Sequence, residues 1–311
     1  MAHEFETGLF VHKPAWHQLG VVLEDYPDPQ KAFQCSGLDW EVKKEQLLLP
    51  SQNLLTDRYA ITRSSDNRIL GYSGAKYEVY QNEKAFEWVT PLVDSGIWKI
   101  DAAGSLKMGE VCWILLKQDE YDFIPGDTLK EYLLLTWAHN GHLTNIIQPT
   151  SIRVVCNNTL QASLSNSNQV KIRHTSTIFQ KMDYIQDLFK QSGESFENQR
   201  LAFEKMLGTT LTDSQLEQFV DTQFPVPVKE GRGKTLAKKK NETMKQMVFG
   251  AASGHKELGI VNTAYGLYQA IVEANEHVFV NKNTDPGMNI LFGTGFRNNK
   301  ESFEEVMKLA S

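Results

Sequence analysis

The chain has 311 residues, of which 32 are Lys or Arg and 38 are Asp or Glu, so its formal net charge is −6. Hydrophobic residues make up 41% and charged residues 23%, which is typical of a folded protein and excludes a disordered or collagen-like chain. The mild acidity excludes a uniformly basic nucleic-acid coat protein, but it is compatible with a basic patch on an acidic body.

The first part of the chain predicts mainly strands. Residues 1–34 mix turns and short elements, with one short helix expected at Pro29–Cys35. A strand is expected at Trp40–Leu49, and a hairpin is expected where Arg58–Thr62 and Arg68–Tyr72 flank a polar turn. Apolar residues at helical spacing then predict a helix over Asn82–Ser95, which Gly96 ends.

A second β-rich block follows that helix. Strands are expected at Trp98–Ser105, Glu110–Lys117 and Glu131–His139. Asn140-Gly141 is the strongest hairpin-turn signal in the chain. The pattern over Arg153–Leu164 fits either the end of a strand or a helix, and the sequence does not choose between them.

The last part of the chain predicts helices. They are expected at Thr175–Lys190, Phe196–Leu207, Asp213–Phe219, Glu242–Gly250, Gly259–Phe279 and Ser302–Leu309. Prolines, glycines and lysines break the periodicity over residues 223–240, which predicts a loop. We therefore expect an α+β fold, with an antiparallel sheet and packed helices in residues 1–190. A mainly helical region should follow in residues 191–311, with a basic linker at about residues 225–240.

The cysteine pattern and the N-terminus indicate the compartment. Cys35, Cys112 and Cys156 form no CxxC pair, so a disulfide framework or a zinc knuckle is not expected. No apolar run approaches the roughly 20 residues that span a bilayer, and the first residues do not form a signal peptide. We expect a soluble, cytoplasmic protein with no membrane contact.

The most informative feature is a segment without acidic residues. From Tyr132 to Met182 there is no Asp or Glu, although Arg153, Lys171, Arg173 and Lys181 lie within it. A surface that approaches phosphates excludes carboxylates and keeps amides, hydroxyls and cations. Aromatic residues of the segment could stack on bases if exposed; they include Tyr132, Trp137 and Phe179. A buried strand followed by a polar loop would also lack acids, but it explains the polar residues 165–182 poorly.

A second basic segment lies in residues 229–245. It holds seven basic residues against Glu230 and Glu242. It is either a flexible arm that grips a polyanion or an ordinary solvated loop. Within it, residues 231–235 resemble half of a P-loop, but Val228 stands where the first glycine is needed, so nucleotide-triphosphate binding is rejected.

Other chemistry-bearing residues favour structural roles. Trp16-His17 is expected to anchor the N-terminal segment, and Cys156 is expected to be a small core residue. His139 and His142 bracket the predicted turn without a third metal ligand, so a polar hairpin tip is expected there. Glu273 and His277 are four residues apart on a predicted helix, which is typical of a surface contact. No catalytic residue, metal site or cofactor is expected.

Three motifs carry a resemblance to a known family. They are Trp16–Gly20, Arg153–Leu160 with Arg173-His174-Thr175, and the segment from Thr263 to His277. With them the chain resembles the phage/plasmid-like proteins known as domain of unknown function 932, a laterally transferred family with no assigned activity. The order of strands, helices and basic residues is more distantly similar to the single-strand annealing proteins of phages.

The resemblance to annealing proteins implies a DNA-binding function. It implies binding and annealing of single-stranded DNA during recombination, without nucleotide hydrolysis, in the cytoplasm of a bacterial host and as a homo-oligomeric ring or filament. Phosphate contacts would come from Arg153, Lys171, Arg173, His174 and Lys181, with hydrogen bonds from Asn157, Asn158 and Thr159. A mobile clamp would comprise Arg232, Lys234, Lys238, Lys239 and Lys240. Two alternatives stay open: a nucleic-acid- or nucleotide-processing enzyme with a dispersed site, and a phage–host interaction protein that counters a host defence.

Overall fold

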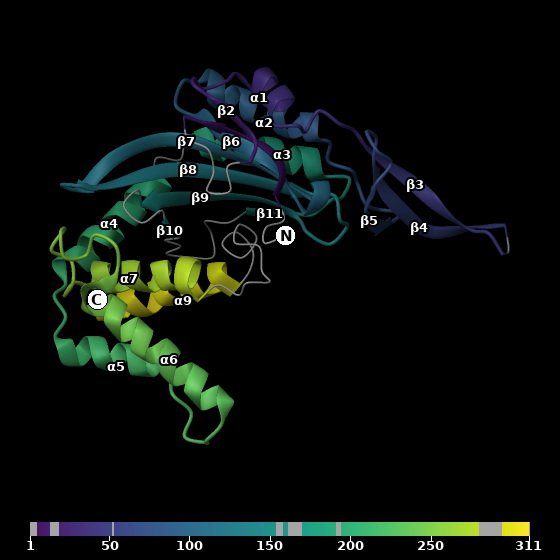
Figure 1. Ribbon diagram of the computed structural model, residues 1–311. Coiled ribbons are helices and arrows are strands. Elements are labelled where there is room, and N and C mark those ends of the chain that lie inside the picture. The colour runs from purple at the N-terminus through teal and green to yellow at the C-terminus, as the bar shows by residue number, and fades with distance from the viewer. Residues whose placement is uncertain are drawn as a thin grey trace.

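The computed structural model describes residues 5–12, 19–51, 53–153, 158–160, 170–190, 194–279 and 294–310. Strands fill the first half of the chain and helices dominate the second (Figure 1). The expected α+β class, with antiparallel sheets and a helical C-terminal region, is confirmed.

The larger sheet has eight strands in the order β10-β9-β8-β7-β6-β1-β2, with β11 beside β9. Their bounds are β1 Phe5–Val11, β2 Val21–Leu23, β6 Lys99–Leu106, β7 Val111–Ile124, β8 Asp127–Ala138, β9 Asn145–Arg153, β10 Asn158–Leu160 and β11 Val170–Ile172. All neighbours are antiparallel except β1 and β2. The three strands expected between Trp98 and His139 are confirmed, whereas β1 and β2 lack a clear alternating pattern and were not predicted.

The smaller sheet has the order β3-β4-β5, formed by β3 Val42–Leu49, β4 Leu54–Arg63 and β5 Ile69–Gly74. The predicted hairpin is confirmed, because Arg58 pairs with Gly74 and Thr62 with Ile69 across the polar turn. The distal ends of β3 and β4 extend beyond β5 and project away from the rest of the molecule (Figure 1).

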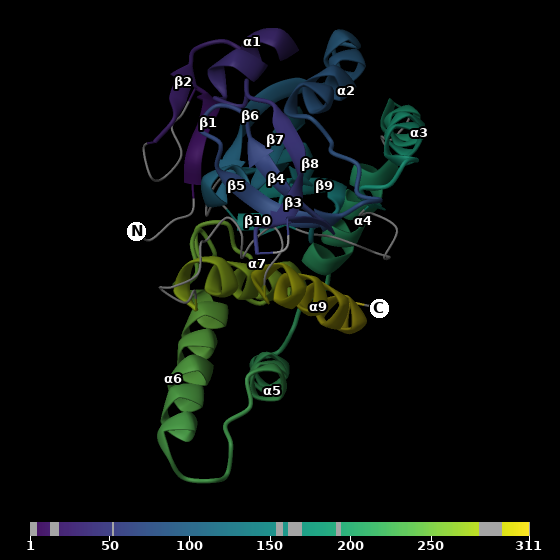
Figure 2. The same ribbon diagram turned by 90° about the vertical axis from the view of Figure 1, so that its right-hand side faces the viewer.

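Three helices flank the N-terminal strands: α1 Pro29–Cys35, α2 Asn82–Asp94 and α3 Ile178–Lys190. The first two lie side by side over the larger sheet, and α3 packs against α2 (Figure 2). The prediction for α2 is confirmed, even though Pro91 lies inside the helix. Proline is tolerated there because it stands near the C-terminal end, where Gly96 and Ser95 close the helix.

The remaining helices form the lower part of Figure 1. They are α4 Glu194–Gly208, α5 Asp213–Gln223, α6 Arg232–Gln246, α7 Ala264–Glu273 and α9 Thr294–Leu309, with π-helical turns η3 Met247–Ala251 and η4 Ala274–Val278. A short 3-10 turn, η1 Lys107–Gly109, joins β6 to β7. The predicted start of α5 is confirmed, since Thr212 and Gln215 form a capping box. The other expected helices match α3, α4, and α7 with η4, within about five residues, whereas α9 begins at Thr294, well before the expected start at Ser302.

Two hydrophobic cores stabilise the described chain. One lies between the larger sheet and α1, α2 and α3, with Phe86, Trp98 and Trp137 among its largest members. The other surrounds α7, where Phe303 packs edge to face against Phe203 and Tyr268. Because Phe196 of α4 belongs to the first core and Phe203 to the second, α4 joins the two. The division of the chain at residue 190 stays a prediction.

The β8–β9 connection differs from the tight hairpin and polar tip expected at Asn140-Gly141. Residues 139–144 join the strands, and His139 is fully buried. Its Nε2 donates to Asn82 Oδ1, which also accepts from Trp137, while Asn82 Nδ2 donates to Leu38. His139 is therefore a core residue that ties β8 to α2, and its expected place at an exposed tip was wrong.

Candidate nucleic-acid interface

The acid-free segment begins on β8, inside the larger sheet, and its described strands after β8 lie along one edge of that sheet. Strand β9 pairs with two short strands on its outer side, β10 at one end and β11 at the other. Thr159 faces Ile152, and Lys171 faces Ile146. These positions are six residues apart on β9, which corresponds to about 20 Å along the strand.

Several of the candidate residues belong to the strands that form this edge. Arg153 is the last residue of β9 and pairs with Asn158 of β10. Thr159 follows in β10, while Asn157 lies outside the described residues. Arg153–Leu164, left open by the sequence, therefore begins as a strand end and not as a helix.

Three cations at the other end of the edge are exposed. Lys171 lies on β11, Arg173 on the connection to α3, and Lys181 on α3. None of the three forms an ion pair with another residue in the described parts of the chain. Their charge is thus available to an anionic ligand, because no acidic neighbour in the described structure neutralises it.

His174 does not belong to this exposed surface. Its side chain is buried, its ring stacks on Tyr77 with centroids 4.6 Å apart, and its Nδ1 lies 3.0 Å from the carbonyl oxygen of Glu78. Burial lowers the pKa of His174, so the ring is held neutral. The expectation that His174 contacts phosphate was wrong; the residue anchors the end of β11 against residues 77–78.

Of the three aromatic residues considered from the sequence, one is exposed, and a second exposed ring lies just beyond the segment. Tyr132 and Trp137 are buried and cannot stack on a ligand, whereas the Phe179 side chain is 43% exposed. Tyr184 is 67% exposed and was not considered from the sequence, because it lies just beyond the acid-free segment. It is three residues after Lys181 on α3, so the two side chains are neighbours on one helix face. That spacing is the signal that could have identified it.

The second basic segment is a helix and not the expected linker. Residues from Arg232 to Gln246 form α6, which packs on α5. Asn241 and Met244 are buried, and Asn241 Nδ2 donates to Asp221 of α5. The predicted loop is confirmed for residues 224–231. It was wrong for residues 232–240, because so few positions of this helix touch the core that no apolar periodicity is visible.

Acidic and aromatic neighbours engage most cations of α6. Lys234 lies 2.5 Å from Glu230, Lys238 lies 3.7 Å from Glu242, and Lys245 lies 2.9 Å from Asp221. The first two are i,i+4 pairs and the third joins α6 to α5; all three are modestly stabilising and leave less free charge for a ligand.

Lys240, a member of the expected clamp, lies between two aromatic rings. Its Nζ lies 5.1 Å from the ring centroid of Phe224 and 4.7 Å from that of Phe279. Burial lowers its pKa, and the cation–π contacts hold the side chain against the protein. Among the clamp candidates, Arg232 and Lys239 are exposed without a described ion pair.

The two basic segments do not share one groove. In both views α3 lies beside the larger sheet, while α6 extends from the lower end of the molecule (Figures 1 and 2), and β11 lies with the sheet (Figure 1). A strand bound at the sheet edge would therefore not be enclosed by α6.

The C-terminal motif proves to be structural in the described chain. Thr263 caps α7 by accepting from Gly266, and Tyr268 is fully buried. Glu273 accepts hydrogen bonds from the backbone and hydroxyl of Ser253, so it fixes the connection before α7. His277 is exposed, and the expected surface contact between it and Glu273 is not observed.

The described residues offer no obvious metal chemistry. Within them, no group of three or more His, Cys, Asp or Glu residues could hold a metal ion. Nor does any helix in the described ranges combine the length and apolar composition needed to cross a membrane.

Comparison with known proteins gives a family but no activity. The profile of a family described as a domain of unknown function (DUF932) matches residues 69–303. Because this match covers most of the chain, the protein belongs to the DUF932 family. No curated protein and no solved structure matches the sequence.

Proposed function

We propose that this protein binds single-stranded DNA along the edge of its larger sheet. The observation that carries the proposal is the cation triad Lys171, Arg173 and Lys181, which is exposed and has no described acidic partner. It belongs to a segment, residues 132–182, that contains no Asp or Glu. A polyanion requires this combination of free cations and absent carboxylates.

The dimensions of the edge suit a short stretch of an extended strand. The roughly 20 Å between the β10 and β11 ends corresponds to about six nucleotides at the 3.4 Å spacing of one strand of a duplex, and to fewer if the strand is stretched. This is within the range of sites on other single-strand-binding proteins. Tyr184 beside Lys181 supplies an exposed ring on which a base can stack, whatever its identity.

The acidic remainder of the protein supports the same assignment. The chain is net negative, so a polyanion is repelled from most of its surface and concentrated where acids are missing. In contrast, ion pairs already occupy Lys234 and Lys238 of α6. We therefore assign the main phosphate contacts to the sheet edge and only a minor electrostatic role to α6.

We further propose that binding serves strand annealing in phage- or plasmid-type recombination, in the bacterial cytoplasm. A protein that holds the backbone at an open edge leaves the bases accessible for pairing. Annealing would then need no nucleotide hydrolysis, which fits the absence of a P-loop in the sequence.

The direct test is fluorescence anisotropy with a labelled single-stranded oligonucleotide over a series of salt concentrations. We expect log affinity to fall linearly with log salt, with a slope of about −0.7 for each phosphate neutralised. No binding at low salt would contradict the proposal. A second assay follows the pairing of two complementary strands without added nucleotide. Binding without acceleration of pairing would retain the DNA site and reject annealing.

A further inference from the structure

The projecting end of the small sheet carries an unusual apolar tip. Leu48 pairs with Leu55 and Leu49 with Leu54 across β3 and β4. The side chains of these residues are exposed by 47%, 60%, 41% and 55%, respectively. Each is a large apolar side chain left in water at the end of an arm.

The geometry of the tip indicates insertion into a cleft. Directly opposed residues share a face of a ribbon and successive residues alternate, so each face of the tip carries one leucine pair. The first part of β4, before Arg58, does not pair with β5. In the described chain, β3 pairs only with β4. Both edges of the tip therefore present unpaired backbone groups. A bare two-stranded ribbon of this kind is marginal in water, which favours a partner that covers it.

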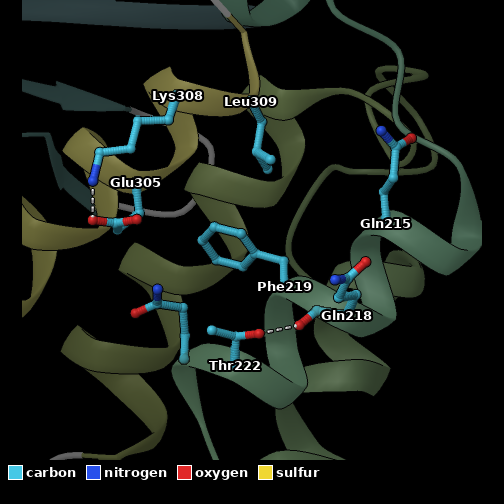
Figure 3. Close-up of a pocket in the computed structure, with 8 residues that line it drawn as sticks. Gln215, Gln218, Phe219, Thr222, Glu305, Lys308 and Leu309 are labelled. Atoms are coloured by element: carbon cyan, nitrogen blue, oxygen red, sulfur yellow. Dashed lines mark hydrogen bonds and ion pairs between the residues drawn. The ribbon is translucent and has the colours of Figure 1, made fainter.

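A complementary hollow lies on the same chain between α5 and α9. It has a volume of about 330 Å³ and a floor of Phe219 and Leu309 (Figure 3). Its rim is polar but carries no free charge among the labelled residues, since Lys308 and Glu305 pair with each other. The other rim residues are amides and one hydroxyl: Gln215, Gln218, Thr222 and Gln223.

The two surfaces match in size and in chemistry. A cavity of about 150 Å³ already accommodates a benzene ring, so this hollow has room for about two leucine side chains, or one cross-strand pair. The glutamine side chains offer both donors and acceptors, which suit the unpaired N–H and C=O groups along the ribbon edges. A rim of lysines could only donate hydrogen bonds and a rim of carboxylates could only accept them.

The arm of one chain does not reach its own hollow. In both views the arm leaves the upper part of the molecule, while α5 lies at its lower end (Figures 1 and 2). We propose that the Leu48–Leu55 tip of one copy docks into the α5–α9 hollow of a second copy. The contact is heterologous, so it joins copies head to tail into a closed ring or an open chain. It involves neither α3 nor β11 and does not depend on the proposed DNA binding.

The contact should be weak, because the buried surface is small. Light scattering after size-exclusion chromatography, on nuclease-treated protein without DNA, should show a mean mass that rises above the monomer value with concentration. Two variants should each abolish this rise: L54N/L55N, which makes both faces of the tip polar, and L309R, which places a charged side chain in the hollow. The matched control L236N changes an equally exposed leucine on α6 and should associate as the native protein does.

Mixing the two variants tests whether the arm of one copy docks into the hollow of another. The arm variant keeps an intact hollow, and the hollow variant keeps an intact arm. A mixture should therefore form a one-to-one dimer and nothing larger, which also shows that both variants are folded. A native protein that stays monomeric at all concentrations would overturn the proposal. So would variants that associate normally, or a mixture that stays monomeric.

Discussion

Arg63 on β4 donates a hydrogen bond to Glu6 on β1, with 2.7 Å between Nη1 and Oε1. This is the ion pair that fastens the small sheet to the large one. The Arg63 side chain is buried over the ring of Trp40, and Glu6 also accepts from Ser105. A second carboxylate, Asp66, takes the other side of the guanidinium, and Arg63 holds the pKa of Asp66 well below its usual range.

Removing this buried charge should destabilise the fold. We expect Glu6→Gln to lower the free energy of unfolding by about 2 kcal/mol, since Asp66 still compensates part of the Arg63 charge. Urea unfolding measures the change. Asp57→Asn is the matched control, because Asp57 pairs with Arg58 only at 3.9 Å and in full exposure. It should change stability by less than about 0.5 kcal/mol. Equal losses in both variants would show that the Glu6 pair has no special role.

Two glycines in helices should respond to alanine with opposite signs. A Cβ at Gly266 of α7 would lie 2.0 Å from the carbonyl oxygen of Ile260, whereas a Cβ at Gly233 of α6 would meet nothing. We expect Gly266→Ala to cost more than about 2 kcal/mol. Gly233→Ala should stabilise the protein by up to about 1 kcal/mol, because alanine favours the helix. Thermal melting compares them. No stabilisation by Gly233→Ala would argue against a helix at the start of α6.

His139 should make the protein sensitive to mild acid. Burial lowers the pKa of His139 to about 3, so the unfolded chain binds a proton near pH 6.5 while the folded chain does not. Stability is therefore complete above about pH 6.5 and falls as the pH drops, by on the order of 1 kcal/mol per pH unit. His139→Gln cannot titrate and should reduce the slope of stability against pH. Urea unfolding at pH 7, 6 and 5 gives both slopes, and identical slopes would refute this assignment.

Glu131 on β8 should have the opposite dependence. Burial, together with the nearby Asp119 carboxylate, raises the pKa of Glu131 to about 7. The folded state then binds the proton more tightly than the unfolded state, so stability present below about pH 4.5 is lost as the pH rises through 7. Glu131→Gln should stabilise the protein by on the order of 2 kcal/mol at pH 8 and little at pH 5.

A neighbouring acid provides the control for this prediction. Lys117 lowers the pKa of Glu120, so Glu120→Gln should weaken the protein slightly at pH 8. The same urea experiment at the two pH values covers both variants. An equal effect of Glu131→Gln at pH 5 and pH 8 would show that its carboxyl is not perturbed.

Local patterns predicted most of the fold. Alternation and turn residues located β6, β7, β8 and the β4–β5 hairpin, and apolar spacing located α2, α3 and α4, because these elements each bury one regular face. Strands β1 and β2 were missed, since β1 pairs with β6, about 90 to 100 residues later in the chain, and β2 pairs in turn with β1. The first part of α6, residues 232–241, was missed because lysine–glutamate pairs, and not a continuous apolar face, support it, whereas the end of α6 matches the helix expected at Glu242–Gly250.

The exposure of the candidate residues was predicted in part, while their role in binding stays a prediction. The absence of Asp and Glu pointed to residues 132–182. Within them, Lys171 and Arg173 at the sheet edge and Lys181 on α3 are exposed. The sequence could not show that His174 turns inward to stack on Tyr77, because both are placed by contacts between distant elements. It also could not show that α6 and the sheet edge point to different sides of the molecule. The sequence left open whether the two basic segments lie beside each other, and the fold separates them.

Two charge-matched variants distinguish the sheet edge from α6 as the DNA-binding surface, when their oligonucleotide binding is measured over a series of salt concentrations. The triple variant K171Q/R173Q/K181Q and the α6 variant R232Q/K238Q/K239Q each remove three exposed or partly exposed cations. If the sheet edge binds the strand, the first should weaken binding strongly and reduce the slope of log affinity against log salt by up to about 2, while the second should change the slope little. If the α6 variant reduces the slope of log affinity against log salt as much as the sheet-edge variant does, or more, the sheet edge is not the main DNA-binding surface.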